Sequence, residues 1–121
     1  MNILLLGSGG REHALALALL SGHDRRLFVA PGNAGTARHN VDLDLDDHQE
    51  IIDFCEGERI DLVVIGPEAP LVAGLADDLR ASGIECFGPS SAAARLEGSK
   101  AFTRQFASTH GIPGPRSATF T

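Results

Sequence analysis

Short runs of apolar residues alternate along the chain with stretches in which apolar residues recur at helical spacing. The short runs are rich in leucine, isoleucine and valine, which is typical of strands buried on both faces. They lie at residues 2–6, 27–30, 62–65 and 84–87, with a weaker run at 41–43. Helical spacing covers residues 10–21, 47–57, 71–81 and 99–109, and a further helix start is predicted at Ser90-Ser91. This alternation predicts an α/β fold with an open, mostly parallel sheet and helices on both faces.

Composition and charge narrow the possible functions. The chain has 121 residues, of which 43% are apolar, and this is enough for one domain with its own core. Its net charge of −6 argues against binding to nucleic acid or to a membrane surface, because both favour basic patches. No apolar run approaches the length that spans a bilayer, and the N-terminus does not read as a signal peptide. We therefore expect a cytoplasmic protein that binds small molecules.

The two cysteines carry no metal or disulfide signature. Cys55 lies in a predicted helix and Cys86 in a predicted strand, and no Cys-x-x-Cys spacing occurs. We expect both to be reduced thiols in the core, and we expect no metal site in this chain.

A glycine-rich loop follows the first predicted strand directly. Residues 3–6 lead into Gly7-Ser8-Gly9-Gly10-Arg11-Glu12, where a helix is predicted to begin. Glycines let the backbone turn sharply and approach a ligand, and the first turn of a helix offers free N–H groups to an anion. This arrangement makes a phosphate-binding site the leading hypothesis.

The loop departs from the fingerprint of dinucleotide-binding proteins. Glu12 stands where the third glycine would be, and Ala30-Pro31-Gly32 occupies the place of the acidic residue that binds ribose. A ligand with a single phosphate fits better, because Arg11 can hold phosphate through its planar guanidinium. Glu12 would repel phosphate, so it either contacts another part of the ligand or caps the helix.

Other loops at the same predicted edge of the sheet carry polar groups. Asn33 and Gly35 follow the second strand, Glu68 follows Pro67 after the strand at 62–65, and each either contacts the ligand or belongs to an ordinary turn. His13 likewise either contacts the ligand or packs. Ligands in open α/β sheets bind beyond the carboxyl ends of the strands, so these loops are expected to share one cleft. Lys100 is the only lysine, and it stands at a probable helix start.

The C-terminal segment has the composition of a linker. Gly111-Ile112-Pro113-Gly114-Pro115 is followed by residues 117–121, which read as the beginning of a strand. A complete domain seldom ends by starting a new element. We therefore expect residues 1–110 to form an N-terminal domain, and residues 111–121 to be a linker and the start of a further domain that this chain lacks.

Five motifs in order resemble one family, phosphoribosylamine–glycine ligase (glycinamide ribonucleotide synthetase). The motifs are Gly9-Gly10-Arg11-Glu12-His13-Ala14, Ala30-Pro31-Gly32-Asn33-Ala34-Gly35-Thr36, Gly66-Pro67-Glu68-Ala69-Pro70-Leu71, Phe87-Gly88-Pro89 and Leu96-Glu97-Gly98-Ser99-Lys100-Ala101-Phe102. The resemblance implies a Rossmann-like domain that precedes an ATP-grasp domain. It also implies an enzyme of purine biosynthesis that joins glycine to 5-phosphoribosylamine through a glycyl phosphate, with ATP and magnesium or manganese as cofactors.

The resemblance implies roles for individual residues. Substrate-binding residues would be Gly9, Gly10, Arg11, Glu12, Asn33, Gly35, Pro67 and Glu68. The 5-phosphate would lie at Arg11 and the glycines before it, whereas Glu12 and Glu68 would contact ribose hydroxyls or the amine. Lys100 would reach toward the phosphates of ATP, where this domain meets the ATP-grasp domain.

Two alternatives stay open from the sequence. The chain could be half of an NAD(P)-binding oxidoreductase, or a non-catalytic nucleotide-binding module. Because the family enzymes are much longer and the metal-binding carboxylates of the ATP-grasp domain are missing here, we expect this chain alone to bind no cofactor and to show no ligase activity.

Overall fold

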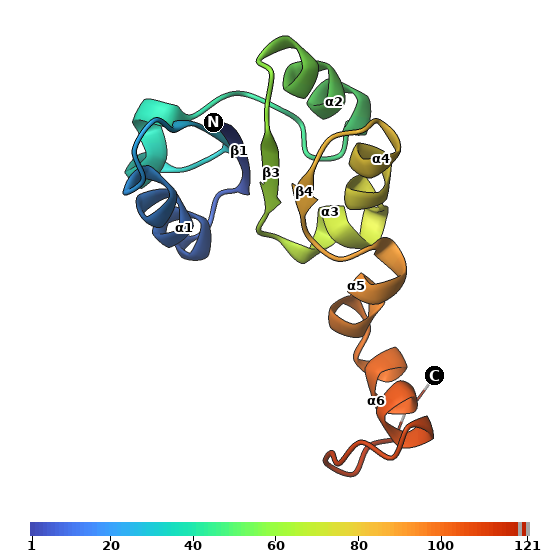
Figure 1. Cartoon of the computed structure of the whole chain (residues 1–121). Coiled ribbons are helices and arrows are strands. Elements are labelled where there is room, and N and C mark those ends of the chain that lie inside the picture. Colours follow the sequence, from blue (N-terminus) through green and yellow to red (C-terminus); the bar gives the residue numbers. More distant parts are fainter. Residues whose placement is uncertain (119, 121) are drawn as a thin grey trace.

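A computed structural model describes residues 1–118 and 120. Within them, four strands form an all-parallel sheet in the order β2-β1-β3-β4 (Figure 1). The strands are β1 (Asn2–Gly7), β2 (Arg26–Pro31), β3 (Leu62–Ile65) and β4 (Cys86–Phe87). The predicted α/β fold is therefore confirmed, and the register pairs Leu5 of β1 with Val29 of β2 and Val64 of β3.

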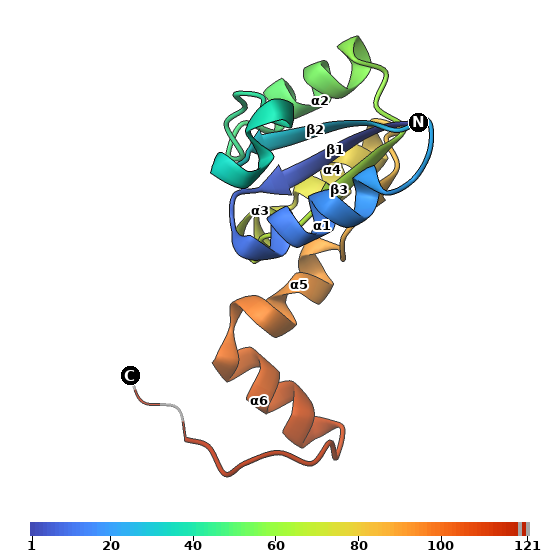
Figure 2. The ribbon, with the colours of Figure 1, turned by 90° about the vertical axis from the view of Figure 1, so that its left-hand side faces the viewer.

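Helices cover both faces of the sheet, as Figures 1 and 2 show. One face packs on α1 (Gly10–Leu20), and the other on α2 (His48–Gly57), α3 (Glu68–Ala73) and α4 (Leu75–Ala81). Side chains of a strand alternate between faces, so Ile3 and Leu5 of β1 join the α1 side while Leu4 and Leu6 join the other. All four are buried, which explains why β1 has no polar positions between Ile3 and Leu6.

The strand predicted at residues 41–43 is wrong. The chain touches the sheet there only through an isolated parallel bridge between Val29 and Asn40, in which the Val41 N–H donates to the Val29 carbonyl at 2.9 Å. After that bridge the chain leaves the edge of β2 and crosses toward α2, and Leu43 packs into the α2 side of the core. The apolar side chains of this segment therefore follow the core rather than a strand.

The helix predicted at residues 71–81 is also wrong in its bounds. Two helices, α3 and α4, occupy residues 68–81, and they are separated at Gly74, whose φ of 98° is left-handed. This conformation ends a helix readily at glycine, because no Cβ is present to clash.

The last strand is shorter than the predicted 84–87. The Ile84 N–H donates to the Leu79 carbonyl at 2.9 Å, so Ile84 still belongs to the turn that closes α4. Only Cys86 and Phe87 are strand residues.

Helices α5 (Ser91–Gly98) and α6 (Lys100–Thr109) lead away from the sheet in both Figure 1 and Figure 2. The predicted helix starts are confirmed, since the Ser90 and Ser99 hydroxyls accept hydrogen bonds from the N–H groups of Ala93 and Phe102. No residue of α6 is buried. In the predicted strand at 117–121, residues 117, 118 and 120 lie in no strand, and the rest lies outside the described residues.

Candidate functional site

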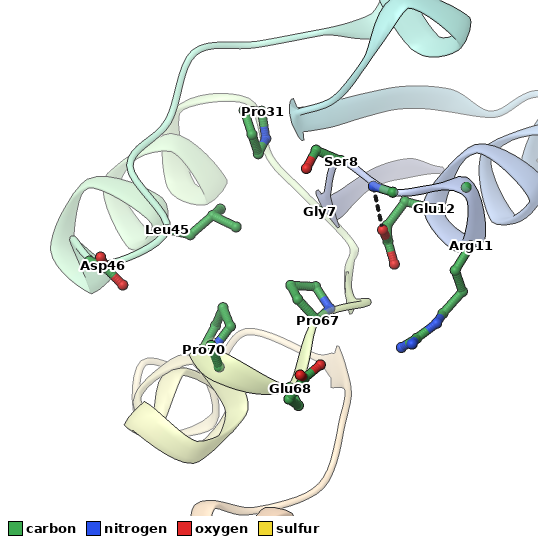
Figure 3. Close-up of a pocket in the computed structure, with 13 residues that line it drawn as sticks. Gly7, Ser8, Arg11, Glu12, Pro31, Leu45, Asp46, Pro67, Glu68 and Pro70 are labelled. Atoms are coloured by element: carbon green, nitrogen blue, oxygen red, sulfur yellow. Dashed lines mark hydrogen bonds between the residues drawn. The ribbon is translucent and has the colours of Figure 1, made fainter. Parts of the chain in front are cut away.

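The carboxyl ends of β1, β2 and β3 open into a cleft of about 610 Å³ (Figure 3). Its walls come from the loop after β1, from the end of β2, from the segment before α2 and from the start of α3. The lining residues are Gly7, Ser8, Gly9, Gly10, Arg11, Glu12, Pro31, Leu45, Asp46, Pro67, Glu68, Ala69 and Pro70. The strand exits that the sequence singled out at β1 and β3 therefore do meet in one place.

Glu12 is buried beneath the glycine-rich loop, with 6% of its surface exposed. Its Oε2 accepts a hydrogen bond of 2.8 Å from the N–H of Gly9, the residue that caps α1 (Figure 3). Methyl groups added at Gly7, Gly9 or Gly66 would overlap the Glu12 side chain. The carboxylate thus acts as a helix cap in this structure and at the same time forms part of the cleft wall.

Arg11 joins two of the strand exits. Its Nη1 donates a hydrogen bond of 2.8 Å to the Gly66 carbonyl, which follows β3. The side chain is otherwise exposed at the cleft, and Figure 3 shows the guanidinium on the same side of the cleft as Glu68. One end of the cleft therefore holds a fixed positive charge with several N–H groups free for an anion.

Asn33 holds the loop after β1 in place by hydrogen bonds. Its Nδ2 donates to the carbonyls of Ser8, at 2.9 Å, and Gly9, at 3.3 Å, and its Oδ1 accepts from the Gly35 N–H at 2.8 Å. The side chain thereby ties the loop after β1 to the helix η1 (Ala34–His39). Neither Asn33 nor Gly35 is among the lining residues.

Gly35 of η1 lies against the imidazole of His13 in α1, away from the cleft. A methyl group at Gly35 would overlap the His13 imidazole, so this glycine permits a close approach between η1 and α1. His13 lines a separate groove between those helices rather than the cleft.

Pro67 and Glu68 begin α3 and line the cleft, whereas Lys100 does not. Lys100 is the first residue of α6, in the part of the molecule that leads away from the sheet (Figure 2). Nothing in this structure brings Lys100 to the glycine-rich loop.

Sequence reasoning missed the wall formed by Leu45 and Asp46. Both precede α2, in the segment expected to follow a strand. The segment is held by its own acidic residues: the Asp46 N–H donates to Asp44, and Asp47 caps α2 by accepting from the Glu50 N–H at 3.0 Å. No local pattern in this segment indicates the cleft wall, because the path of the chain after β2 decides which of its residues reach the cleft.

The charges in the cleft are unequal. The guanidinium of Arg11 lines the cleft together with the carboxylates of Glu12, Asp46 and Glu68. Such a site suits a ligand with one anionic group, bound at Arg11, and an amine or hydroxyl groups that donate to carboxylates.

The two thiols are free, as predicted. Burial raises the pKa of Cys55 to about 11 and also raises the pKa of Cys86. Across residues 1–118 and 120, no group of three or more His, Cys, Asp and Glu side chains could hold a metal ion. The same residues include no helix that is long and apolar enough to cross a membrane.

A protein-family comparison identifies the domain. Residues 1–97 match the family described as phosphoribosylglycinamide synthetase, N domain. The chain belongs to this family. The resemblance that the sequence motifs carried is thereby confirmed.

Relatives of this N domain are biosynthetic enzymes. The chain is 59% identical over 116 residues to phosphoribosylamine–glycine ligase of Agrobacterium fabrum, covering 93% of this chain and 27% of the relative. It is 52% identical over 124 residues to the trifunctional purine biosynthetic protein adenosine-3 of Gallus gallus, covering 98% of this chain and 12% of the relative. The chain thus spans about a quarter of the length of the ligase relatives.

Solved structures agree on the fold. The crystal structure of phosphoribosylamine–glycine ligase from Thermotoga maritima superposes with a TM-score of 0.65 at 29% identity, over 96% of this chain and 26% of that chain. An N5-carboxyaminoimidazole ribonucleotide synthetase from Thermus thermophilus matches with a TM-score of 0.62 at 24% identity, covering 93% of this chain and 31% of that one, and it bears on the fold alone.

Proposed function

We propose that this chain supplies the phosphoribosyl-binding wall of an ATP-dependent phosphoribosylamine–glycine ligase. The observation that carries the proposal is the cleft itself. In a domain of this family, a single guanidinium and three carboxylates line the edge of the sheet where α/β proteins bind ligands. Phosphoribosylamine has one phosphate, which the guanidinium can bind, and two hydroxyl groups and one amine, which can donate hydrogen bonds to carboxylates.

Each side chain then has a distinct task. Arg11 and the N–H groups of Gly9 and Gly10 would bind the 5-phosphate at the start of α1. Glu68 would accept hydrogen bonds from the ribose hydroxyls or the amine. Glu12 would fix the glycine-rich loop by accepting the hydrogen bond from the Gly9 N–H. Its second carboxylate oxygen would accept from the ribose hydroxyls or the amine, as Glu68 would.

The remaining chemistry belongs to the longer protein. ATP, together with magnesium or manganese, would activate the glycine carboxylate on an ATP-grasp domain, and Lys100 would approach the ATP phosphates where the two domains meet. We assign residues 1–110 to the substrate-binding domain, and residues 111–121 to a linker and the start of the ATP-grasp domain. The exposed side chains of Phe106 in α6 and of Ile112 after it, 37% and 51% accessible, support a contact of this segment with that further domain. The cytoplasmic location stays a prediction from the sequence.

The test is a titration of the ¹⁵N-labelled chain with glycinamide ribonucleotide, with NAD as the comparator. We expect amide shifts confined to residues 7–12, 45–46 and 66–70 with the ribonucleotide. Arg11→Ala should abolish these shifts, while the matched variant Arg104→Ala, at an exposed arginine of α6, should leave them unchanged.

Other outcomes decide against the proposal. A response to NAD alone would favour the oxidoreductase alternative, and shifts unaffected by Arg11→Ala would remove the phosphate from the glycine-rich loop. Ligase activity is expected to be missing from the purified chain, because the activating domain lies outside it. Any turnover above a blank without protein would contradict that expectation.

A further inference from the structure

Thr36 of η1 is a buried polar residue, with 2% of its surface exposed. Its Oγ1 accepts a hydrogen bond of 2.9 Å from the Asn33 N–H. The hydroxyl proton has two acceptors within reach, Oδ1 of Asn40 at 2.7 Å and the Asn33 carbonyl at 3.2 Å. Because a hydroxyl carries one proton, the shorter contact makes Asn40 its main partner. The buried hydroxyl therefore joins Asn33 to Asn40.

Asn40 is held by its backbone and by both ends of its side chain. The backbone forms the parallel bridge to Val29 at the edge of β2. In the side chain, Oδ1 accepts from Thr36, and Nδ2 donates to the Asn33 carbonyl at 3.0 Å. A methyl group at Gly32 would overlap this Oδ1, so the amide lies directly against the backbone of the segment that follows β2. Asn40 thus ties that segment to the sheet.

Asn33 passes this connection on to the glycine-rich loop. Its Nδ2 donates to the carbonyls of Ser8, at 2.9 Å, and Gly9, at 3.3 Å. The N–H of the preceding residue, Gly32, donates to the Gly7 carbonyl at 3.1 Å. Three successive carbonyls of the loop after β1 are therefore held from the side of β2. A continuous chain of hydrogen bonds runs from the edge of the sheet to the wall of the cleft.

The held carbonyls fix the direction of the N–H groups in the loop, because the carbonyl and the N–H of a planar trans peptide point in opposite directions. In the peptide between Ser8 and Gly9, the carbonyl faces Asn33. Its N–H donates to Oε2 of Glu12 at 2.8 Å, in the cleft wall. In the next peptide the carbonyl again faces Asn33, so the Gly10 N–H points away from it. This N–H has no acceptor in the part of the chain that the structure describes, and it is available to an anion.

We propose that Thr36 and Asn40 are positioning residues for the phosphate of the substrate. Acting through Asn33, they hold the glycine-rich loop so that the Gly10 N–H already points toward the phosphate before the substrate binds. A donor that is oriented in advance binds more tightly, because binding no longer has to order it. Neither Thr36 nor Asn40 lines the cleft, so both act at a distance from the ligand. This role depends on the ligase proposal, since it requires a phosphate at the glycine-rich loop.

Backbone order in the ligand-free chain is the first test, measured by ¹⁵N relaxation. We expect order parameters of about 0.85, the value of a rigid backbone, at the Gly9 and Gly10 amides of the wild type, and lower values in Asn40→Ala. Asn2→Ala is the matched control. The Asn2 Nδ2 also donates to two backbone carbonyls, at 2.9 and 3.2 Å, but at the opposite end of β1. Its loss should leave the glycine-rich loop rigid.

A titration with glycinamide ribonucleotide measures the effect on binding, at a temperature where circular dichroism shows each variant to be folded. Asn40→Ala should raise the Kd by roughly threefold or more, and Asn2→Ala should leave it unchanged. Thr36→Val keeps the shape of the side chain without its hydroxyl and should weaken binding as Asn40→Ala does. Thr36→Ser keeps the hydroxyl but loses a methyl group, and it should bind like the wild type. A purely structural role would make the affinity follow the free energy of unfolding instead of the hydroxyl.

Three results would overturn the positioning role. They are unchanged order parameters in Asn40→Ala, equal affinities of Asn40→Ala and the wild type, and equal affinities of Thr36→Val and Thr36→Ser. If the wild type binds the ribonucleotide and any of these results is found, the positioning role fails while the ligase proposal stands. If the wild type shows no amide shifts at residues 7–12, the ligase proposal fails, and the positioning role fails with it.

Discussion

Replacing Gly66 with alanine should damage the cleft through Glu12. The new methyl group would overlap Oε1 of Glu12 and lie 2.7 Å from its Cδ and 2.8 Å from its Cγ. Gly7 and Gly9 leave no room on the other sides, so the carboxylate has to swing out into the cleft. That movement breaks the 2.8 Å hydrogen bond from the Gly9 N–H and removes the cap of α1.

The expected cost follows from the broken cap. Loss of a capping hydrogen bond to a charged group costs about 1–3 kcal/mol of the free energy of unfolding. The backbone of Gly66 adds no strain, because its φ is not left-handed. The damage is therefore purely steric and should depend on the presence of the Glu12 side chain.

Urea unfolding of four proteins measures this dependence: the wild type, Gly66→Ala, Glu12→Ala and the double variant. Alanine at position 66 should cost almost nothing once Glu12 is alanine, which gives a coupling free energy of about 1–3 kcal/mol. Gly10→Ala is the matched control in the same loop. A methyl group there meets nothing within 4 Å, and alanine should change the free energy of unfolding by less than about 0.5 kcal/mol.

The reasoning fails if Gly66→Ala lies within about 0.5 kcal/mol of the wild type, the usual range for innocuous surface changes. It also fails if alanine at position 66 costs the same with and without Glu12.

Three further predictions concern the rest of the domain. Asn33→Ala loses three hydrogen bonds and should lower the free energy of unfolding by about 1–3 kcal/mol in urea. Gly74→Ala places an alanine in the left-handed conformation between α3 and α4, and it should lower the free energy of unfolding by about 1–2 kcal/mol in the same assay. The control variant, Gly57→Ala, should not lower it. Because burial raises the pKa of Cys55 from 9.0 to about 11, the unfolded chain releases this proton first. The free energy of unfolding should therefore fall as pH rises from 9 to 11, by roughly 1–3 kcal/mol, and Cys55→Ala should remove that fall in urea titrations at several pH values.

The layout of the sheet was largely predictable from local pattern. The runs at 2–6, 27–30 and 62–65 are strands because unbroken apolar runs of this length can be buried only between two layers of helices. The segment Val41-Asp42-Leu43 also carries apolar side chains, but they contact the core where the chain departs from β2. The difference depends on the point at which Asn40 bridges to β2. The spacing of apolar residues along the chain carries no information about that contact.

The cleft was predictable in part. Arg11, Glu12, Pro67 and Glu68 line it because strand order brings the loops after β1 and β3 together, as parallel α/β topology requires. Asp46 was not predictable, because its place in the wall is decided by the path of a loop and by local caps such as Asp47.

By itself, the sequence determined the elements of this protein, the sites of its helix caps and the chemical groups gathered at its strand exits, since each depends on residues close together in the chain. Only the tertiary structure decided that Glu12 is enclosed by Gly7 and Gly66, that Asn33 holds the loop after β1, and that three arginines line one groove beside β2. These contacts join residues distant in the chain, and their geometry follows from packing against neighbours that no local pattern specifies.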